Sequence, residues 1–194
     1  MPLDNQQKKY TYADYLKWPE DQRWELIEGV PWAMTPAPST EHQLVVGELF
    51  RQLSNYFMGK NCLVFIAPFE VRLPQGEEKD EEIETVVQPD IAVICDRSKI
   101  DTRGCRGVPD FIIEVVSPNT ASRDYIQKLA LYERNGVKEY WIVHPLDKIA
   151  MVYRLTKNGQ YGRPEIYSEE HSVPVSIFQD LAVDLKTVFS LAKL

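Results

Sequence analysis

The sequence is poor in cysteine and in long apolar runs, and each shortage excludes a class of protein. Its three cysteines, Cys62, Cys95 and Cys105, are odd in number, widely spaced and form no CxxC pair. This spacing predicts neither a disulfide scaffold nor a thiolate zinc site and favours a reducing compartment. No apolar run approaches the roughly 18 residues of a membrane span, and the polar start at residues 1–5 is unlike a signal peptide. We therefore expect a cytoplasmic protein with no membrane partner.

The motifs of several common enzyme classes are also missing. No glycine-rich phosphate loop occurs, which disfavours the nucleotide-binding folds. The three histidines, His42, His144 and His171, lack any close metal-ligand spacing. Ser117 lies outside the glycine pattern of a nucleophile elbow, so a hydrolase triad with His144 is disfavoured as well. The residues that carry chemistry must be sought elsewhere.

What the chain does contain is an ordinary apolar fraction and an uneven negative charge. Its 194 residues, 44% of them hydrophobic, suit one domain with a buried core. The formal net charge is −7, of which residues 77–84 contribute −5, so the rest of the chain sums to −2. Such an acidic run is usually a solvated loop. The net negative charge disfavours a protein that coats DNA non-specifically, and it allows an enzyme that binds phosphates locally.

Hydrophobic periodicity predicts a chain in which helices and strands alternate. Apolar residues at helical spacing between Thr40 and Gly59 predict a long helix, with Thr40 and Gln43 as a capping box. A second helix is expected over residues 122–135, ended by Gly136. Strands are expected at residues 24–28, 30–34, 63–73, 86–94, 110–116, 139–143, 149–155 and 181–185, and short helices at residues 11–17 and at the end of the chain.

This order of elements predicts an α/β fold in which a central mixed β-sheet is flanked by helices. We find no internal repeat, low-complexity segment or linker. The chain is therefore interpreted as a single domain over residues 1–194. It would comprise an N-terminal extension of about residues 1–35, a core of about 40–155 and a C-terminal tail of about 156–194.

Three acids stand out because they interrupt apolar strand patterns. Asp90 follows Pro89 inside the apolar segment 86–94, Glu114 lies in the segment 111–116, and Glu28 ends the first predicted strand. Burying a lone carboxylate costs several kcal/mol unless it is paired, protonated or bound to a cation. Either each acid faces solvent at an exposed sheet edge, or the acids share a partner.

A cation for these acids is available on the following helix. Lys128 has Asp124 one turn before it and Tyr132 one turn after it, so the three share one helix face. An exposed Asp–Lys pair is the alternative explanation of this spacing.

Taken in order, these motifs resemble the PD-(D/E)XK nuclease superfamily, and more closely the Uma-two family of restriction-endonuclease-like proteins. The resemblance covers roughly residues 10–189 and rests on the ordered set rather than on any one piece. Its main pieces are Glu25-Leu26-Ile27-Glu28-Gly29, His42, Gln88-Pro89-Asp90-Ile91-Ala92-Val93, Pro109-Asp110-Phe111-Ile112-Ile113-Glu114-Val115-Val116-Ser117-Pro118, the segment 124–128, Tyr132, Gly136-Val137-Lys138-Glu139-Tyr140-Trp141 and Val152-Tyr153-Arg154. The superfamily usually has a lysine two residues after the acid, where this chain has Val116. The resemblance implies that Lys128 supplies that amine.

The resemblance implies a restriction-endonuclease-like fold and a nuclease that needs Mg²⁺, with Mn²⁺ as a substitute. Asp90 and Glu114 would hold the metal, because hard oxygen ligands suit Mg²⁺. Lys128 would orient or help deprotonate the attacking water, and Glu28 would contact the metal directly or through water. His42 would be structural or line the cleft.

The implied partner is nucleic acid, with DNA expected, and a homodimer is compatible with the sequence. The competing hypothesis is a DNA-binding or protein-interaction module that keeps the fold without catalysis. The nuclease hypothesis makes a structural prediction. Asp90 and Glu114 should converge from adjacent strands, and Lys128 should point from its helix into the cleft between them.

Overall fold

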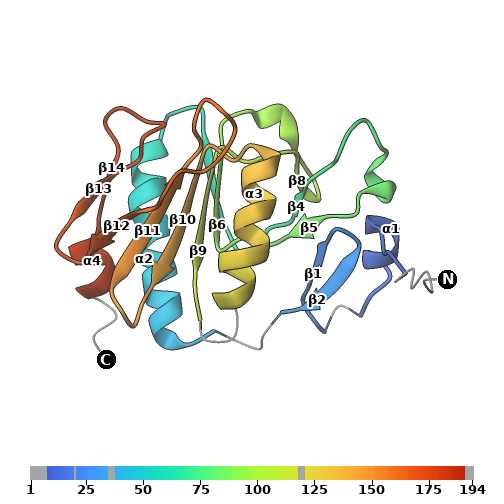
Figure 1. Ribbon diagram of the computed structural model, residues 1–194, viewed down its shortest axis with the longest axis horizontal. Coiled ribbons are helices and arrows are strands. Elements are labelled where there is room, and N and C mark those ends of the chain that lie inside the picture. Colours follow the sequence, from blue (N-terminus) through green and yellow to red (C-terminus); the bar gives the residue numbers. More distant parts are fainter. Residues whose placement is uncertain (1–7, 20, 35–37, 118–120, 191–194) are drawn as a thin grey trace.

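A computed structural model of the chain describes residues 8–19, 21–34, 38–117 and 121–190. Its strands form two six-stranded sheets and one two-stranded sheet (Figure 1). The helices are α1 (Tyr12–Tyr15), α2 (Thr40–Phe57), α3 (Leu129–Asn135), α4 (Leu185–Ser190), the short 3-10 helices η1 (Asp80–Glu82) and η2 (Arg97–Lys99), and the π-helix η3 (Arg123–Lys128). The strands are β1 (Trp24–Ile27), β2 (Val30–Ala33), β3 (Leu63–Ile66), β4 (Val71–Arg72), β5 (Val86–Val87), β6 (Ile91–Ile94), β7 (Ile100–Asp101), β8 (Gly104–Arg106), β9 (Phe111–Val115), β10 (Glu139–His144), β11 (Ile149–Arg154), β12 (Glu165–Ser168), β13 (Ser172–Pro174) and β14 (Ala182–Asp184).

The central sheet has the order β12-β11-β10-β9-β6-β3 and is mixed, as predicted. Only β9 and β10 run parallel; the other neighbours in this sheet are antiparallel. The helical segment between β9 and β10 makes the crossover that a parallel pair requires. The α/β class and the flanking helices expected from the sequence are confirmed.

The second six-stranded sheet, with the order β2-β1-β5-β4-β8-β7, was not predicted. The sequence suggests single long strands at residues 63–73 and 86–94, and the structure divides each of them between the two sheets. Each break contains a proline, Pro68 or Pro89, which has no N–H to donate to a strand ladder. In Figure 1 the strands β1 and β2 lie with α1 at the N-terminal end of the molecule, away from β11 and β12.

Alternation along the central strands decides which helix each side chain meets. Ile91, Val93, Phe111 and Ile113 pack in the cluster that contains the apolar face of α2. Ala92 and Ile112, which alternate with them along the strands, point to the other face. There they pack with Leu131 and Tyr132 of α3 and with apolar residues of the second sheet. Glu114 has the parity of this second face, so its carboxylate is directed toward η3 and α3 rather than toward α2.

The caps of the two long helical segments agree with the sequence in one case and not in the other. Gly136 ends α3 in the left-handed conformation, with φ of 81°, as expected for a glycine after a helix. At the start of α2, Ser39 rather than Thr40 is the cap, because the Ser39 side chain accepts a hydrogen bond from the His42 N–H. The predicted capping box at Thr40 is therefore wrong by one residue.

The sequence predicts no disulfide scaffold and favours a reducing compartment, but Cys62 and Cys95 form a disulfide. The antiparallel register of β3 and β6 places Leu63 opposite Ile94, so the next residues outward, Cys62 and Cys95, face each other. Their separation of 33 residues in sequence conceals this pairing. Cys105 is a buried free thiol.

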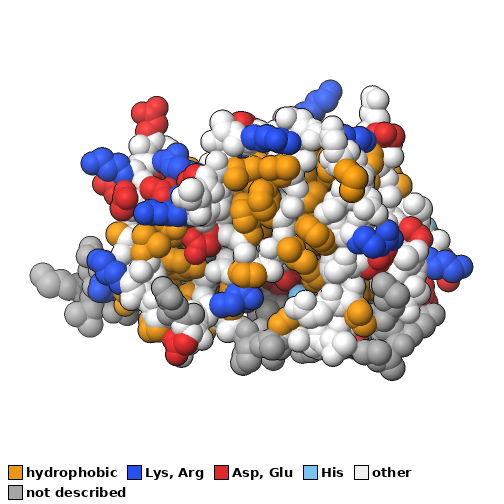
Figure 2. All heavy atoms as spheres, turned by 180° about the vertical axis from the view of Figure 1, so that it is seen from behind, with side chains coloured by type: hydrophobic (Ala, Val, Ile, Leu, Met, Phe, Trp, Pro, Cys, Tyr) orange, Lys and Arg blue, Asp and Glu red, His pale blue; other side chains and the backbone are white. Residues whose placement is uncertain are grey.

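The acidic run at residues 77–84 is more than a solvated loop. Arg72, which is fully buried in β4, pairs with Asp80 of this run and with Asp101 of β7. Ile83 is fully buried as well. Seen from the reverse side, basic and acidic side chains interleave at the end of the molecule that carries α1 and this run (Figure 2).

The C-terminal tail holds more strand than the sequence suggests. Only one strand was expected there, at residues 181–185, and β14 confirms it. The tail also forms β12, which joins the edge of the central sheet, and β13, which pairs with β14. Among the described residues, no helix combines the length and apolarity that a membrane crossing requires.

The packing of α2 on the central sheet generates a stability prediction. Leu49 of α2 is fully buried in the cluster that joins this helix to the sheet. Leu49→Ala should lower the free energy of unfolding by about 2–5 kcal/mol, because it removes apolar contact and leaves a cavity. Leu146→Ala is the matched control, since this leucine is 71% exposed, and should change stability by less than about 0.5 kcal/mol. Denaturant unfolding followed by circular dichroism measures both, and equal effects would contradict this packing.

Candidate active site

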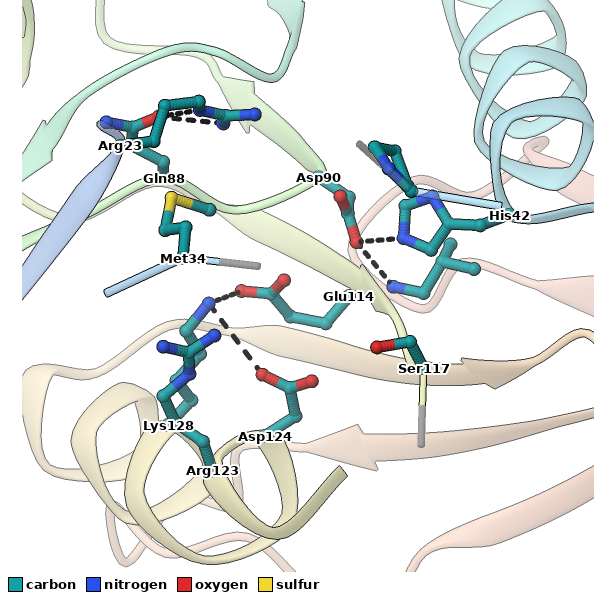
Figure 3. A pocket seen from close by; sticks show the side chains of 12 residues that line it. Arg23, Met34, His42, Gln88, Asp90, Glu114, Ser117, Arg123, Asp124 and Lys128 are labelled. Atoms are coloured by element: carbon teal, nitrogen blue, oxygen red, sulfur yellow. Dashed lines mark hydrogen bonds and ion pairs between the residues drawn. The ribbon is translucent and has the colours of Figure 1, made fainter. Parts of the chain in front are cut away.

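A cavity of about 80 Å³ lies where the adjoining ends of β6 and β9 meet the start of α2 and the π-helix η3 (Figure 3). Its walls combine carboxylates, cations and one imidazole. The lining residues are Arg23, Met34, Pro38, His42, Gln88, Asp90, Glu114, Val115, Ser117, Arg123, Asp124 and Lys128. Three of the four site residues predicted from the sequence, Asp90, Glu114 and Lys128, are therefore brought to one cavity.

Strand register explains why Asp90 and Glu114 meet. The antiparallel pairing of β6 with β9 sets Ile91 opposite Ile113, so the next residues along each chain, Asp90 and Glu114, come side by side. Asp90 lies just outside β6, where its Oδ2 accepts a hydrogen bond of 2.8 Å from the Val115 N–H. The two acids line the same cavity, which confirms the predicted convergence.

His42 reaches Asp90 from the first turn of α2, on the opposite side of the cavity from η3 (Figure 3). Its Nε2 lies 3.3 Å from Asp90 Oδ2. Burial lowers the pKa of His42, but the hydrogen bond and the charge of Asp90 outweigh burial and raise it above the usual value. The Nδ1 atom of His42 is buried and has no hydrogen-bond partner among the described residues. His42 therefore orients Asp90 and lines the cleft.

Lys128 points into the cluster of acids, as predicted. Its Nζ lies 2.7 Å from Glu114 Oε1 and 3.7 Å from Asp124 Oδ1, and its side chain is only 3% exposed. The π-helical turn of η3 carries this lysine, and such turns are frequent at functional sites. The exposed Asp–Lys pair that the spacing also allowed is excluded by this burial.

Glu25 completes the cluster, and the sequence interpretation missed it. It is fully buried in β1, its Oε1 lies 2.8 Å from Lys128 Nζ and accepts the Gln88 N–H at 2.9 Å. Its Oε2 lies 3.5 Å from Arg123 Nη1. A signal for Glu25 does exist, because it interrupts the apolar segment Trp24–Ile27 just as Asp90 and Glu114 interrupt theirs.

Glu28, which was expected at the site, lies outside it. Its side chain is 55% exposed and pairs with Arg134 Nη2 at 2.8 Å. The residue has φ of 52°, so the chain turns away at this point into the Gly29 turn. This turn keeps Glu28 from following Glu25 into the cluster. The expectation that Glu28 contacts a metal at this site is therefore wrong.

The cluster gathers three acids around two cations. Among the described residues, Lys128 pairs with Glu25, Glu114 and Asp124, and Arg123 pairs with Glu25. Burial raises the pKa of Glu114 well above its usual value, and the neighbouring carboxylates raise it further against the opposing effect of Lys128. Burial acts to lower the pKa of Lys128, but the surrounding carboxylates outweigh it and raise that pKa, so Lys128 stays protonated.

The donor set suits a hard divalent cation held by few protein ligands. Asp90 and Glu114 supply carboxylate oxygens to one cavity, and both Lys128 and Tyr132 donate to the same oxygen of Glu114, Oε1. Within the described part of the chain, no three His, Cys, Asp or Glu side chains are placed to hold a metal together. Mg²⁺ is commonly bound through one or two carboxylates, with waters and substrate phosphate as its other ligands. The residues present therefore fit such a cation.

Comparison with known proteins identifies the family and the fold. A family model described as "Uma2: Putative restriction endonuclease" matches residues 12–186. An uncharacterized protein of Synechocystis sp., slr1290, is 24% identical over 156 residues, which are 79% of this chain and 78% of that protein. A crystal structure from Anabaena variabilis, titled a putative nuclease belonging to DUF820, superposes with a TM-score of 0.74 at 21% identity, covering 94% of this chain and 98% of that one. The likeness to this last structure establishes the fold.

The buried cluster predicts an unusual pH dependence for Lys128→Met. Without the ammonium, the carboxylates of Glu25, Glu114 and Asp124 face one another, so their pKa values in the folded state rise above the unfolded values. Protonation then stabilises the folded variant, and this stabilisation is lost as the pH rises. The variant should lose about 3–5 kcal/mol of unfolding free energy at about pH 8 and clearly less at about pH 5.

Lys138→Met is the matched control for this measurement. Lys138 also pairs with an aspartate, Asp110, at 2.6 Å, but its side chain is 60% exposed. An exposed pair contributes at most about 1 kcal/mol, so this loss should be small at either pH. Denaturant unfolding at both pH values measures the two variants. Equal, pH-independent losses would contradict the buried cluster.

Proposed function

The chain belongs to the Uma2 family, and from this premise we propose that it hydrolyses phosphodiester bonds of nucleic acid, with DNA as the expected substrate and Mg²⁺ or Mn²⁺ as the required cation. The observation that carries the proposal is a buried, protonated lysine held against a carboxylate in the cavity that a second carboxylate also lines. This arrangement brings metal ligands and a fixed positive charge to one point, as phosphodiester hydrolysis requires.

Asp90 and Glu114 would hold the cation, with Glu114 using the oxygen that Lys128 and Tyr132 leave uncontacted. A bound Mg²⁺ would supply charge neutralisation at the phosphoryl oxygens and a water of lowered pKa. His42 fixes the orientation of Asp90 through its 3.3 Å contact. The protein thus prepares the acids for a cation before substrate arrives.

Lys128 acts by position and charge rather than as a base. In the metal-free protein the surrounding carboxylates raise its pKa, and its protonated form has no lone pair with which to take a proton from water. An ammonium can instead donate hydrogen bonds to the attacking water and to a phosphoryl oxygen. Of the two roles considered from the sequence, orientation of the water is the one we retain.

Two arginines at the cavity supply contacts for a phosphate. Arg123 lines the cavity, its side chain is 10% exposed, and its Nη1 lies 3.5 Å from Glu25 Oε2. Arg23 donates two hydrogen bonds to Gln88 Oε1 and contacts no carboxylate within the described part of the chain. Guanidinium groups with spare donors are well suited to phosphate oxygens. The homodimer and the cytoplasmic location expected from the sequence stay predictions.

Cleavage assays test the proposed roles. Asp90→Asn should abolish cleavage of single- and double-stranded DNA in Mg²⁺ or Mn²⁺, because it removes a metal ligand while keeping the shape of the side chain. Lys128→Met, assayed where circular dichroism shows it folded, should lower the rate by about 10²–10⁴. Glu28→Gln is the control and should retain the rate of the unchanged protein.

The outcomes separate the nuclease from the competing hypothesis. Divalent-dependent cleavage that survives Asp90→Asn would refute the assigned site. Binding of nucleic acid that needs no cation and leads to no cleavage would support the non-catalytic module instead.

Metal binding should strengthen as the pH rises. Below its raised pKa, Glu114 carries a proton and cannot ligate Mg²⁺, so a cation must displace that proton. Calorimetry at about pH 6 and about pH 8 should show tighter binding at the higher pH and release of a proton at the lower pH. Glu114→Gln should remove both the binding and the proton release. Binding that is flat in pH and survives Glu114→Gln would contradict this role.

A further inference from the structure

A second cavity, of about 300 Å³, adjoins the candidate active site and is assigned no role by the proposed chemistry. It is formed by the segment after α1 and the beginning of β1, and its walls include Tyr15, Trp18 and Trp24. Arg23 and Gln88 line both cavities, so the two spaces share a wall. Figure 3 shows this wall, with Arg23 and Gln88 together on one side of the active-site cavity. A volume of this size lies at the lower end of the range for small-molecule sites, about 300–1,000 Å³.

We propose that this second cavity binds an unpaired nucleobase of the substrate strand, next to the phosphodiester bond that is cleaved. This inference rests on the proposed function. The aromatic walls favour a flat ring. Trp18 packs against Tyr15 and Trp24 with ring centroids 5.3 and 5.5 Å apart, so its position is fixed before a ligand arrives. Bases stack on such side chains without regard to sequence, because every base has a π face.

The polar groups of the cavity suit a base better than a phosphate. Trp24 lines the cavity, and its buried indole N–H has no hydrogen-bond partner among the described residues. Glu70 contributes a carboxylate to the wall, which repels phosphate and can accept from an exocyclic amino group. The phosphate is instead matched by the cations Arg23 and Arg123 on the active-site side.

The wall between the cavities is held rigidly. Gln88 Nε2 donates to the Tyr15 hydroxyl at 2.9 Å, while Gln88 Oε1 accepts from Arg23 Nη2 at 2.8 Å. One amide therefore positions both an aromatic wall of the base cavity and the cation that faces the phosphate. A nucleotide spanning this wall would place its base and its phosphate in the two cavities together. Such a base must be unstacked, so the substrate is single-stranded or carries an extruded nucleotide.

A comparison of strands with equal charge tests the proposal. Affinity of the full chain is measured in EDTA, where divalent-dependent cleavage cannot occur, for a short single-stranded thymidine oligonucleotide and for an abasic strand with the same number of phosphates. Removing the bases should weaken binding about 5- to 150-fold, the range of one stacking contact. In Trp18→Ala the two strands should bind alike, with the affinity for the abasic strand unchanged. An intact duplex should show no dependence on Trp18.

Two further variants separate stacking from folding. Trp18→Phe keeps a ring and should retain most of the preference for bases, and Tyr167→Ala removes an aromatic side chain of β12, away from the cavity, and should retain all of it. Equal affinity of the unchanged protein for the two strands would overturn the proposal without any variant. A free nucleoside monophosphate that binds as tightly as the strand would also overturn it, since the cavity would then be a mononucleotide site. If the protein cleaves no nucleic acid but still prefers the strand that carries bases, the proposed nuclease activity is refuted and the base-binding cavity is not.

Discussion

The buried ammonium of Lys128 is the contact on which the arrangement of this molecule depends. It lies within 2.8 Å of two carboxylates that belong to different sheets, Glu25 of β1 and Glu114 of β9, and it is itself carried by η3. A charge at 3% exposure is tolerated only when its partners are held in place. The same ion pairs therefore dock the second sheet on the central one, hold the helical crossover and line the candidate active site. The fold and the proposed function share one cluster.

The sequence predicts the central part of this arrangement because local pattern dictates it. Asp90 and Glu114 stand out as acids in apolar β-branched segments, and a buried acid needs a cation. Lys128 follows on the next helix at a spacing that groups it with Asp124 and Tyr132. Once β6 and β9 pair, Asp90 and Glu114 come side by side, and Lys128 reaches Glu114 from η3. The chemical roles of these residues came from the resemblance to a family. The structure agrees with that resemblance in directing Lys128 toward the acids.

What the sequence does not predict depends on pairing between segments far apart. Glu25 is marked by the same signal as Asp90, but only the docking of β1 beside β5 reveals that it, and not Glu28, reaches Lys128. The disulfide between Cys62 and Cys95 follows from the register of β3 with β6, which no local pattern specifies. Pro68 and Pro89 explain why the two long apolar segments are each divided between the two sheets, since proline interrupts a strand. Those prolines indicate a break in a strand but not the sheet that each half joins.

The charge imbalance of the cluster explains how one site can serve both the fold and a reaction. Glu25, Glu114 and Asp124 surround Lys128 and Arg123, and Asp90 adds a fourth acid at the cavity, so acids outnumber cations in this set of residues. A fully neutral cluster would stabilise the fold more but would offer no attraction to a divalent cation. Burial is the main cause of the raised pKa of Glu114, and repulsion from the neighbouring carboxylates adds to it. A cation entering beside Asp90 and Glu114 would relieve that repulsion, while Lys128, already paired, would keep its position and its charge. The feature that weakens the isolated fold is thus the one that would draw the metal and leave the ammonium ready to face the phosphate.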